Sequence, residues 1–208
     1  MALKMKKRFL KKLTADIKKQ EEGIAVLEFA IAVPVIVTLL MGTIDLVTYV
    51  IAHQRISRAA YTMSNLLTQM DKGLKEAQVS DMMLALNRVS DPYDIATNGK
   101  ATMTAIIGKG PDGVEPDYFK VAWQRCYGAG TGSSSYGAEN TTVAQSSFPV
   151  NTIVTSSQIL IVTEITYNFE PMLGFLPLAG DIEYKSYFRP RRGTIESIQN
   201  DNTTPHSC

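Results

Sequence analysis

Hydrophobic residues are distributed unevenly along this chain, and one stretch stands out. From Phe29 to Ala52 the chain is almost wholly apolar, broken mainly by Asp45. A helix of about 24 residues rises about 1.5 Å per residue and is therefore about 36 Å long. That length exceeds the hydrocarbon core of a bilayer, which is about 30 Å thick. The run predicts a membrane-spanning helix.

The helical pattern continues beyond this run in a different form. Apolar residues recur at spacings of three and four, with charged and polar residues mostly between them: Ile56, Ala59, Ala60, Met63, Leu66, Leu67 and Met70. The spacing predicts one helix over about 24–70 whose outer half carries an apolar stripe for a packed domain. Lys72-Gly73 is typical of a helix stop. Ser80 is the expected cap of a second helix over about 81–89, which Asp91-Pro92 ends.

After Pro92 the pattern changes to short β-like runs separated by turns. Strands are predicted over 101–107, 118–126, 158–169 and 180–189, with an apolar crossover at 171–177. The predicted fold class is therefore α+β, with a long N-terminal transmembrane helix continuing into a small extracytoplasmic domain that contains an antiparallel β-sheet. We expect a leader at 1–23, a transmembrane helix at 24–52, a helical extension at 53–92, a β-rich domain at 93–195 and a flexible tail at 196–208.

Residues 128–147 are rich in Gly, Ser, Thr and Ala and have no strand pattern. A loop of this length inside a compact domain indicates a binding loop, an insertion or disorder. The sequence leaves these three alternatives open, and it does not identify a ligand for the loop.

Charge divides the chain in a way that its net value of +1 conceals. Residues 1–23 contain eight Lys/Arg against Asp16, Glu21 and Glu22, so this segment carries +5 and the remainder −4. Beside an apolar span, a basic run is typical of the side that stays in the cytoplasm, and residues 53–208 are then outside. The run has no interleaved aromatic platform, so we do not expect a nucleic-acid partner.

Two acidic residues, a proline and a glycine mark the predicted span. Glu28 and Asp45 are 17 positions apart, which is about 25 Å along a helix and about 100° around it, so they cannot form one intrahelical site. For Asp45 there are two hypotheses: the carboxylate reaches the outer interface beside Tyr49, or it pairs with another helix. Pro34 should bend the helix, and Gly42 offers a flat surface for close approach.

No catalytic or metal-binding motif is present. Phosphate-binding loops, nucleophile elbows and zinc-protease helices all lack a match, and His53 and His206 form no ligand set. We therefore expect neither enzymatic activity nor a cofactor or metal. Cys126 and Cys208 lie on the side where disulfides persist; they either form one long-range disulfide or remain two unpaired thiols.

The residues around Gly23 resemble a prepilin-type signal. Four apolar residues follow the glycine, and then come Glu28 and Phe29. In that family a membrane peptidase cuts after the glycine, which here implies cleavage between Gly23 and Ile24 and makes Glu28 the fifth residue of the new chain. The wider run from Gly23 through Pro34 to the Gly42–Asp45 group resembles the TadE/TadG-like pseudopilins of tight-adherence (Flp) pili.

The resemblance implies a minor pseudopilin or assembly factor in the bacterial inner membrane, single-pass, with a cytoplasmic N-terminus and a periplasmic domain. It implies as partners the lipid bilayer, other pilins and pseudopilins, a prepilin peptidase, and the pilus assembly platform with its ATPase. Glu28 would pair with the new N-terminal amine of a neighbouring subunit. The alternative hypothesis is an uncleaved single-span membrane protein whose periplasmic domain binds a ligand.

Overall fold

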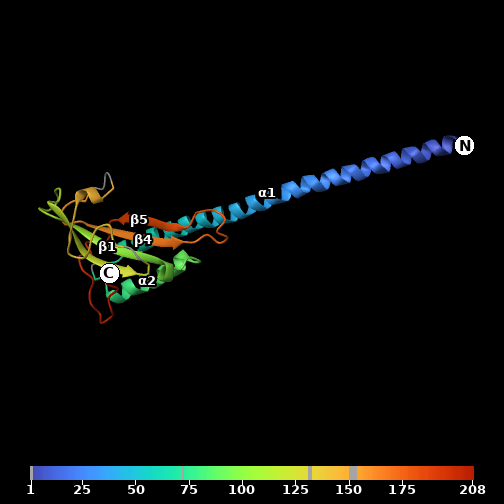
Figure 1. Cartoon of the computed structure of the whole chain (residues 1–208). Helices are drawn as coiled ribbons and strands as arrows, with labels where there is room; N and C mark the ends of the chain where they lie inside the picture. The colour runs from blue at the N-terminus through green and yellow to red at the C-terminus, as the bar shows by residue number, and fades with distance from the viewer. Residues whose placement is uncertain (1, 72, 131–132, 150–153) are drawn as a thin grey trace.

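A long helix projects from a small domain at one end of the molecule (Figure 1). The computed structural model describes residues 2–71, 73–130, 133–149 and 154–208, with side chains from Ile24 onward except Ala25. Helix α1 spans Ala2–Thr68, and its N-terminal half extends away from the domain. The fold class is α+β with an antiparallel sheet, as predicted.

The outer half of α1 buries the stripe that its periodicity predicts. Ile56, Ala59, Ala60, Met63 and Leu67 are buried. They lie on one side of the helix because residues three and four apart share a face. A residue outside the predicted stripe, Ser64, is also buried, and it makes hydrogen bonds to Thr163 (2.8 Å) and Ser186 (2.6 Å) on two strands. This polar contact fixes the helix against the sheet.

The sheet has five antiparallel strands in the order β3-β2-β1-β4-β5. The strands span Gly99–Lys109 (β1), Tyr118–Tyr127 (β2), Thr142–Val143 (β3), Ile159–Phe169 (β4) and Gly180–Phe188 (β5). Each of the four predicted strands is present. Because side chains alternate along a strand, one face of the sheet packs against α1 and α2 while the opposite face forms a smaller apolar cluster.

The second helix begins earlier than predicted. α2 spans Glu76–Ser90, and its N-cap is Lys75 rather than Ser80. The reason is tertiary: Lys75 forms a parallel bridge with Gln199, and the Glu76 amide donates to the Gln199 carbonyl at 3.1 Å. Its end before Asp91-Pro92 agrees with the prediction. A short helix, α3, follows at Ile95–Asn98.

The segment 128–147 packs against the sheet over its described parts, 128–130 and 133–147. It contains β3 and the 3-10 turn η1 (Gln145–Ser147), and it covers the second face with the buried side chains of Tyr136 and Val143. The Tyr136 hydroxyl donates to that of Tyr187 at 2.9 Å. Of the three alternatives, the structure therefore has a packed insertion. Similarly, 171–177 is a hairpin loop between neighbouring strands β4 and β5, not a crossover.

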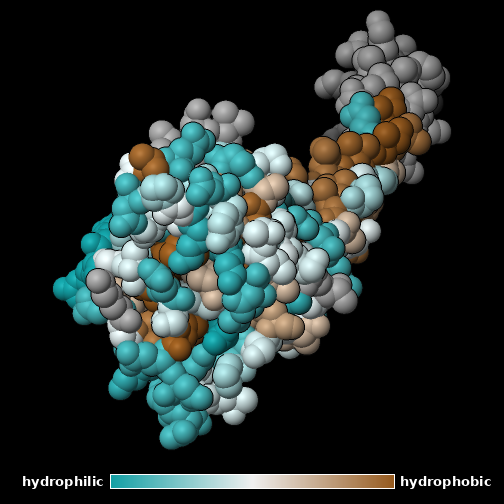
Figure 2. Space-filling model, turned by 90° about the vertical axis from the view of Figure 1, so that its left-hand side faces the viewer, coloured by the Kyte–Doolittle hydropathy of each residue, from teal (hydrophilic) through white to brown (hydrophobic). Residues whose placement is uncertain are grey.

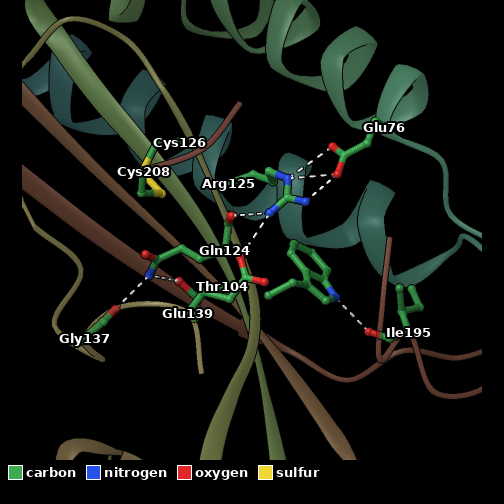
Figure 3. A network of polar contacts seen from close by, with 10 residues as sticks. Glu76, Thr104, Gln124, Arg125, Cys126, Gly137, Glu139, Ile195 and Cys208 are labelled. Carbon is green, nitrogen blue, oxygen red and sulfur yellow. Dashed lines mark hydrogen bonds and ion pairs between the residues drawn. A yellow bond between two sulfur atoms is a disulfide. The ribbon is translucent and has the colours of Figure 1, made fainter. Parts of the chain in front are cut away.

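The tail at 196–208, expected to be flexible, makes several contacts with the domain. A disulfide joins Cys126 to Cys208, and the Cys126 amide donates to the His206 carbonyl at 2.8 Å (Figure 3). Near the start of this segment, the Gln199 amide donates to the Leu74 carbonyl at 2.7 Å. On the tail side, these contacts are made by backbone groups and one cysteine. A hydrophobic periodicity in the tail therefore does not predict them.

A buried ion pair lies beside the disulfide. Arg125 on β2 donates from Nε to both carboxylate oxygens of Glu76 at 3.1 Å, and from Nη2 as well (Figure 3). These hydrogen bonds raise the pKa of Arg125. Trp123 donates its indole N–H to the Ile195 carbonyl at 2.8 Å. The strand, the second helix and the tail are thus joined in one network.

Candidate membrane and assembly site

The exposed half of α1 is apolar on all sides. Most of its large apolar side chains between Ile24 and Ile51 are 40–70% exposed, and the buried apolar residues of the helix begin at Ala52. The helix is coloured as hydrophobic where it leaves the largely hydrophilic domain (Figure 2). Among the described residues, Val26–Thr68 is the one helix long and apolar enough to cross a membrane. A helix that is apolar all round is suited to lipid or to contact with other apolar helices.

Glu28 interrupts this apolar surface near its inner end. Its side chain is exposed, as are those of Ile24 and Phe29, and Gly23 lies in helical backbone one turn earlier. Within the described residues, no hydrogen bond or ion pair involves the Glu28 carboxylate. A carboxylate placed in hydrocarbon would be costly unless it were paired.

Pro34 and the polar residues of the run are accommodated within the helix. α1 is continuous through Pro34, and Figure 1 shows no sharp kink along it. The hydroxyl of Thr38 donates to the Pro34 carbonyl at 2.6 Å, and that of Thr43 to the Leu39 carbonyl at 2.7 Å. Such back-bonding satisfies both hydroxyls without water.

Asp45 is buried by the loop that connects β4 and β5. Its Oδ1 accepts from the Leu173 amide at 2.9 Å, and its Oδ2 accepts from the amides of Phe175 (2.7 Å) and Leu176 (3.1 Å). Neither hypothesis for Asp45 describes this arrangement, because the carboxylate neither reaches the aqueous interface nor pairs with another helix. It fixes a loop of its own chain.

Gly42 lies one turn before Asp45 on the same face of α1. A Cβ atom at Gly42 would meet the side chains of Phe175 and Leu176 at 3.8–3.9 Å. These are ordinary van der Waals distances, so the loop packs against the helix at Gly42 and leaves room for a Cβ atom there. The expected flat surface at Gly42 is used within the chain, by a loop rather than by a second helix.

The comparison with known families concerns this same helix. A family model described as TadE-like protein matches residues 23–63. This N-terminal segment is TadE-like. No curated protein and no solved structure matches the chain. The match confirms the resemblance found in the sequence.

The TadE-like segment contains two separate groups of candidate residues. Gly23, Ile24 and Glu28 lie at its N-terminal end, while Gly42 and Asp45 contact the loop about 20–25 Å further along the helix. Cys126 and Cys208 belong to neither group and hold the tail. The structure therefore places the predicted residues in three separate regions: the N-terminal end of the TadE-like segment, the contact with the β4–β5 loop, and the disulfide that holds the tail.

Sequence reasoning missed the partners of two of these groups. The amides that bind Asp45 come from 128–131 residues further along, and backbone amides carry no signal in sequence. The apolar stretch after the strongest strand was the available clue to an unusual loop. The Glu76–Arg125 pair had no such clue, because its members lie 49 residues apart in ordinary helical and strand sequence.

Proposed function

We propose that this chain is a minor pseudopilin or assembly factor of a tight-adherence pilus, processed by a prepilin peptidase after Gly23. The observation that carries the proposal is the TadE-like segment itself: an exposed apolar helix with a carboxylate, Glu28, that has no partner in the described part of the chain. The proposed role is structural, with no catalytic step.

Cleavage would create the partner that Glu28 lacks. It would leave a free amine on Ile24, four residues before Glu28 and on the same helix face. In a bundle of such helices, the amine of one subunit can pair with Glu28 of its neighbour. A buried ion pair of this kind is sensitive to truncation, since removing one partner typically costs about 3–5 kcal/mol. Stable assembly would thus require cleaved subunits whose helices are aligned so that the amine of one reaches Glu28 of the next.

The apolar helix and the charge distribution support a single-pass arrangement. With the +5 leader in the cytoplasm, the domain lies in the periplasm of a bacterial inner membrane. The disulfide between Cys126 and Cys208 fits an oxidising compartment. The partners in this arrangement are the bilayer, other pilins and pseudopilins, the peptidase, and the assembly platform with its ATPase.

The size of the domain supports a minor role. Residues 53–208 form a five-stranded domain with its own core, which is much larger than the short major pilins of these systems. Such a domain beside every helix would keep the helices apart. A role in initiation, at the tip or in the membrane-bound machinery is therefore proposed instead of the main filament subunit.

The processing step is tested by the mass of the protein from native membranes. We expect a product lacking residues 1–23 in cells with an active peptidase, and the intact chain in cells without it or in a Gly23→Ala variant. An intact N-terminus despite an active peptidase would refute processing. If Gly23→Ala also left piliation normal, the uncleaved single-span protein would be the better account.

The assembly step is tested by Glu28→Ala. Insertion and cleavage should be normal in this variant, whereas the number of pili should fall. Val35→Ala is a matched control, because Val35 is exposed seven residues later on the same face and carries no charge. Normal piliation in the Glu28 variant would refute the pairing.

A further inference from the structure

The loop between β4 and β5 exposes apolar side chains where the domain meets α1. Met172, Leu173 and Phe175 are 78%, 48% and 46% exposed. We propose that this loop is a second membrane contact, inserted into the outer leaflet of the bilayer beside α1. The inference rests on the proposed membrane anchoring of α1 and is independent of processing at Gly23.

The backbone of this loop is fixed although its apolar side chains are not buried. Three hydrogen bonds from backbone amides to the Asp45 carboxylate hold residues 173–176. Gly174 turns the chain with φ = 65°. In water, a loop would be expected to bury such apolar side chains against the domain. Here a buried carboxylate holds the backbone of a loop whose apolar side chains remain about half exposed or more.

The loop lies at the depth where the bilayer should end. Residues 24–44 of a helix are about 31 Å long, which matches a hydrocarbon core of about 30 Å. Phe175 and Leu176 lie against Gly42, just inside that limit. The outer boundary of the span is then near Asp45 rather than at residue 52, and Glu28 lies within the hydrocarbon instead of at its edge.

Aromatic residues mark the same level on the domain. Tyr49 on α1 contacts Phe169 at the end of β4, with ring centroids 5.4 Å apart. Tyr93 donates its hydroxyl to the Thr48 carbonyl at 3.0 Å and contacts Tyr167. Tyrosines are enriched at the boundary between lipid and water, and this group lies about one turn beyond Asp45.

The loop composition favours lipid as the occupant. Residues 171–179 contain no charged side chain, while Glu170 and Asp181 flank them. An uncharged, apolar insertion with acidic flanks is suited to a neutral lipid surface and needs no anionic headgroup. The apolar surface is also continuous with that of α1, which the bilayer already surrounds in the proposed arrangement.

Tryptophan substitutions test this contact in the full chain. The protein has a single, buried tryptophan, Trp123, which provides a constant background. Phe175→Trp and Met172→Trp place probes in the loop, Leu39→Trp places one in the proposed span, and Val114→Trp places one on the exposed β1–β2 turn at the far end of the domain. Each variant is reconstituted in phosphatidylcholine vesicles at low protein density, with lipids brominated either near the headgroup or near the chain end.

We expect both loop probes to lose emission to bromines near the headgroup, and Leu39→Trp to lose emission to bromines near the chain end. Val114→Trp should behave as the unsubstituted protein. Quenched Leu39→Trp with unquenched loop probes would overturn the loop contact and leave the anchoring intact. Unquenched Leu39→Trp would overturn both, and equal quenching of Val114→Trp would overturn the assignment to this loop.

Discussion

Substitution of Asp45 by asparagine tests how the β4–β5 loop is held. The change keeps the size of the side chain and replaces one carboxylate oxygen with an amino group, which cannot accept a hydrogen bond. If the remaining oxygen serves Phe175 and Leu176, the Leu173 amide faces a donor and is left unsatisfied.

The magnitude follows from these three bonds. An unsatisfied buried N–H costs about 1–3 kcal/mol, and a hydrogen bond to a neutral acceptor is about 1 kcal/mol weaker than one to a charged acceptor. One lost bond and two weakened bonds together amount to about 3–5 kcal/mol. Water reaching the opened loop limits the loss, so we take about 3 kcal/mol, which increases loop opening about a hundredfold.

Hydrogen exchange of the full chain in lipid nanodiscs measures this opening. We expect Asp45→Asn to accelerate exchange about a hundredfold in peptides that cover 170–178, and to leave β1 unchanged. Asp81→Asn, at an exposed site on α2, is the matched control and should change neither. Unchanged exchange at 170–178 in Asp45→Asn would refute the proposed anchoring of the loop by this carboxylate.

Three further predictions concern the domain and its tail. Glu76→Ala, which removes the main partner of the partly buried Arg125, should lower the free energy of unfolding by about 3 kcal/mol in denaturant titrations. Glu139→Ala, on the exposed side of the same guanidinium, should cost less than about 1 kcal/mol. Cys208→Ser opens a cross-link of 82 residues and should destabilise the domain by about 2–4 kcal/mol, seen as a lower Tm that matches the reduced parent protein. Hydrogen bonds lower the pKa of Asp201 below its ordinary 3.8, so its contribution to the stability of the tail is complete above pH 3.8 and is lost as the pH falls through the lower pKa of the folded state. Hydrogen exchange at the tail should therefore rise only at such acidic pH. Asp201→Asn should remove this pH dependence.

The elements of this protein follow from local sequence, and the reason is periodicity. The stripe from Ile56 to Leu67 and the four main strands were predictable because each repeats apolar residues with the spacing of its own secondary structure. The TadE-like segment was recognisable for a similar reason, since Gly23, Glu28 and Pro34 lie close together in one continuous run. The start of α2 at Glu76 was not predictable, because the residue that positions it, Gln199, comes from the other end of the chain.

The functions of individual polar residues were decided by the tertiary structure. By sequence, Asp45 is a charge in an apolar helix, and only the fold brings amides from about 130 residues away to its two oxygens. The same holds for Arg125, whose partner lies on another element, and for the tail, which one disulfide and a few backbone bonds hold in place. Apolar burial depends on a pattern that many residues share, so sequence records it. A hydrogen bond depends on the meeting of two particular atoms, and for atoms far apart in the chain that meeting is determined by topology.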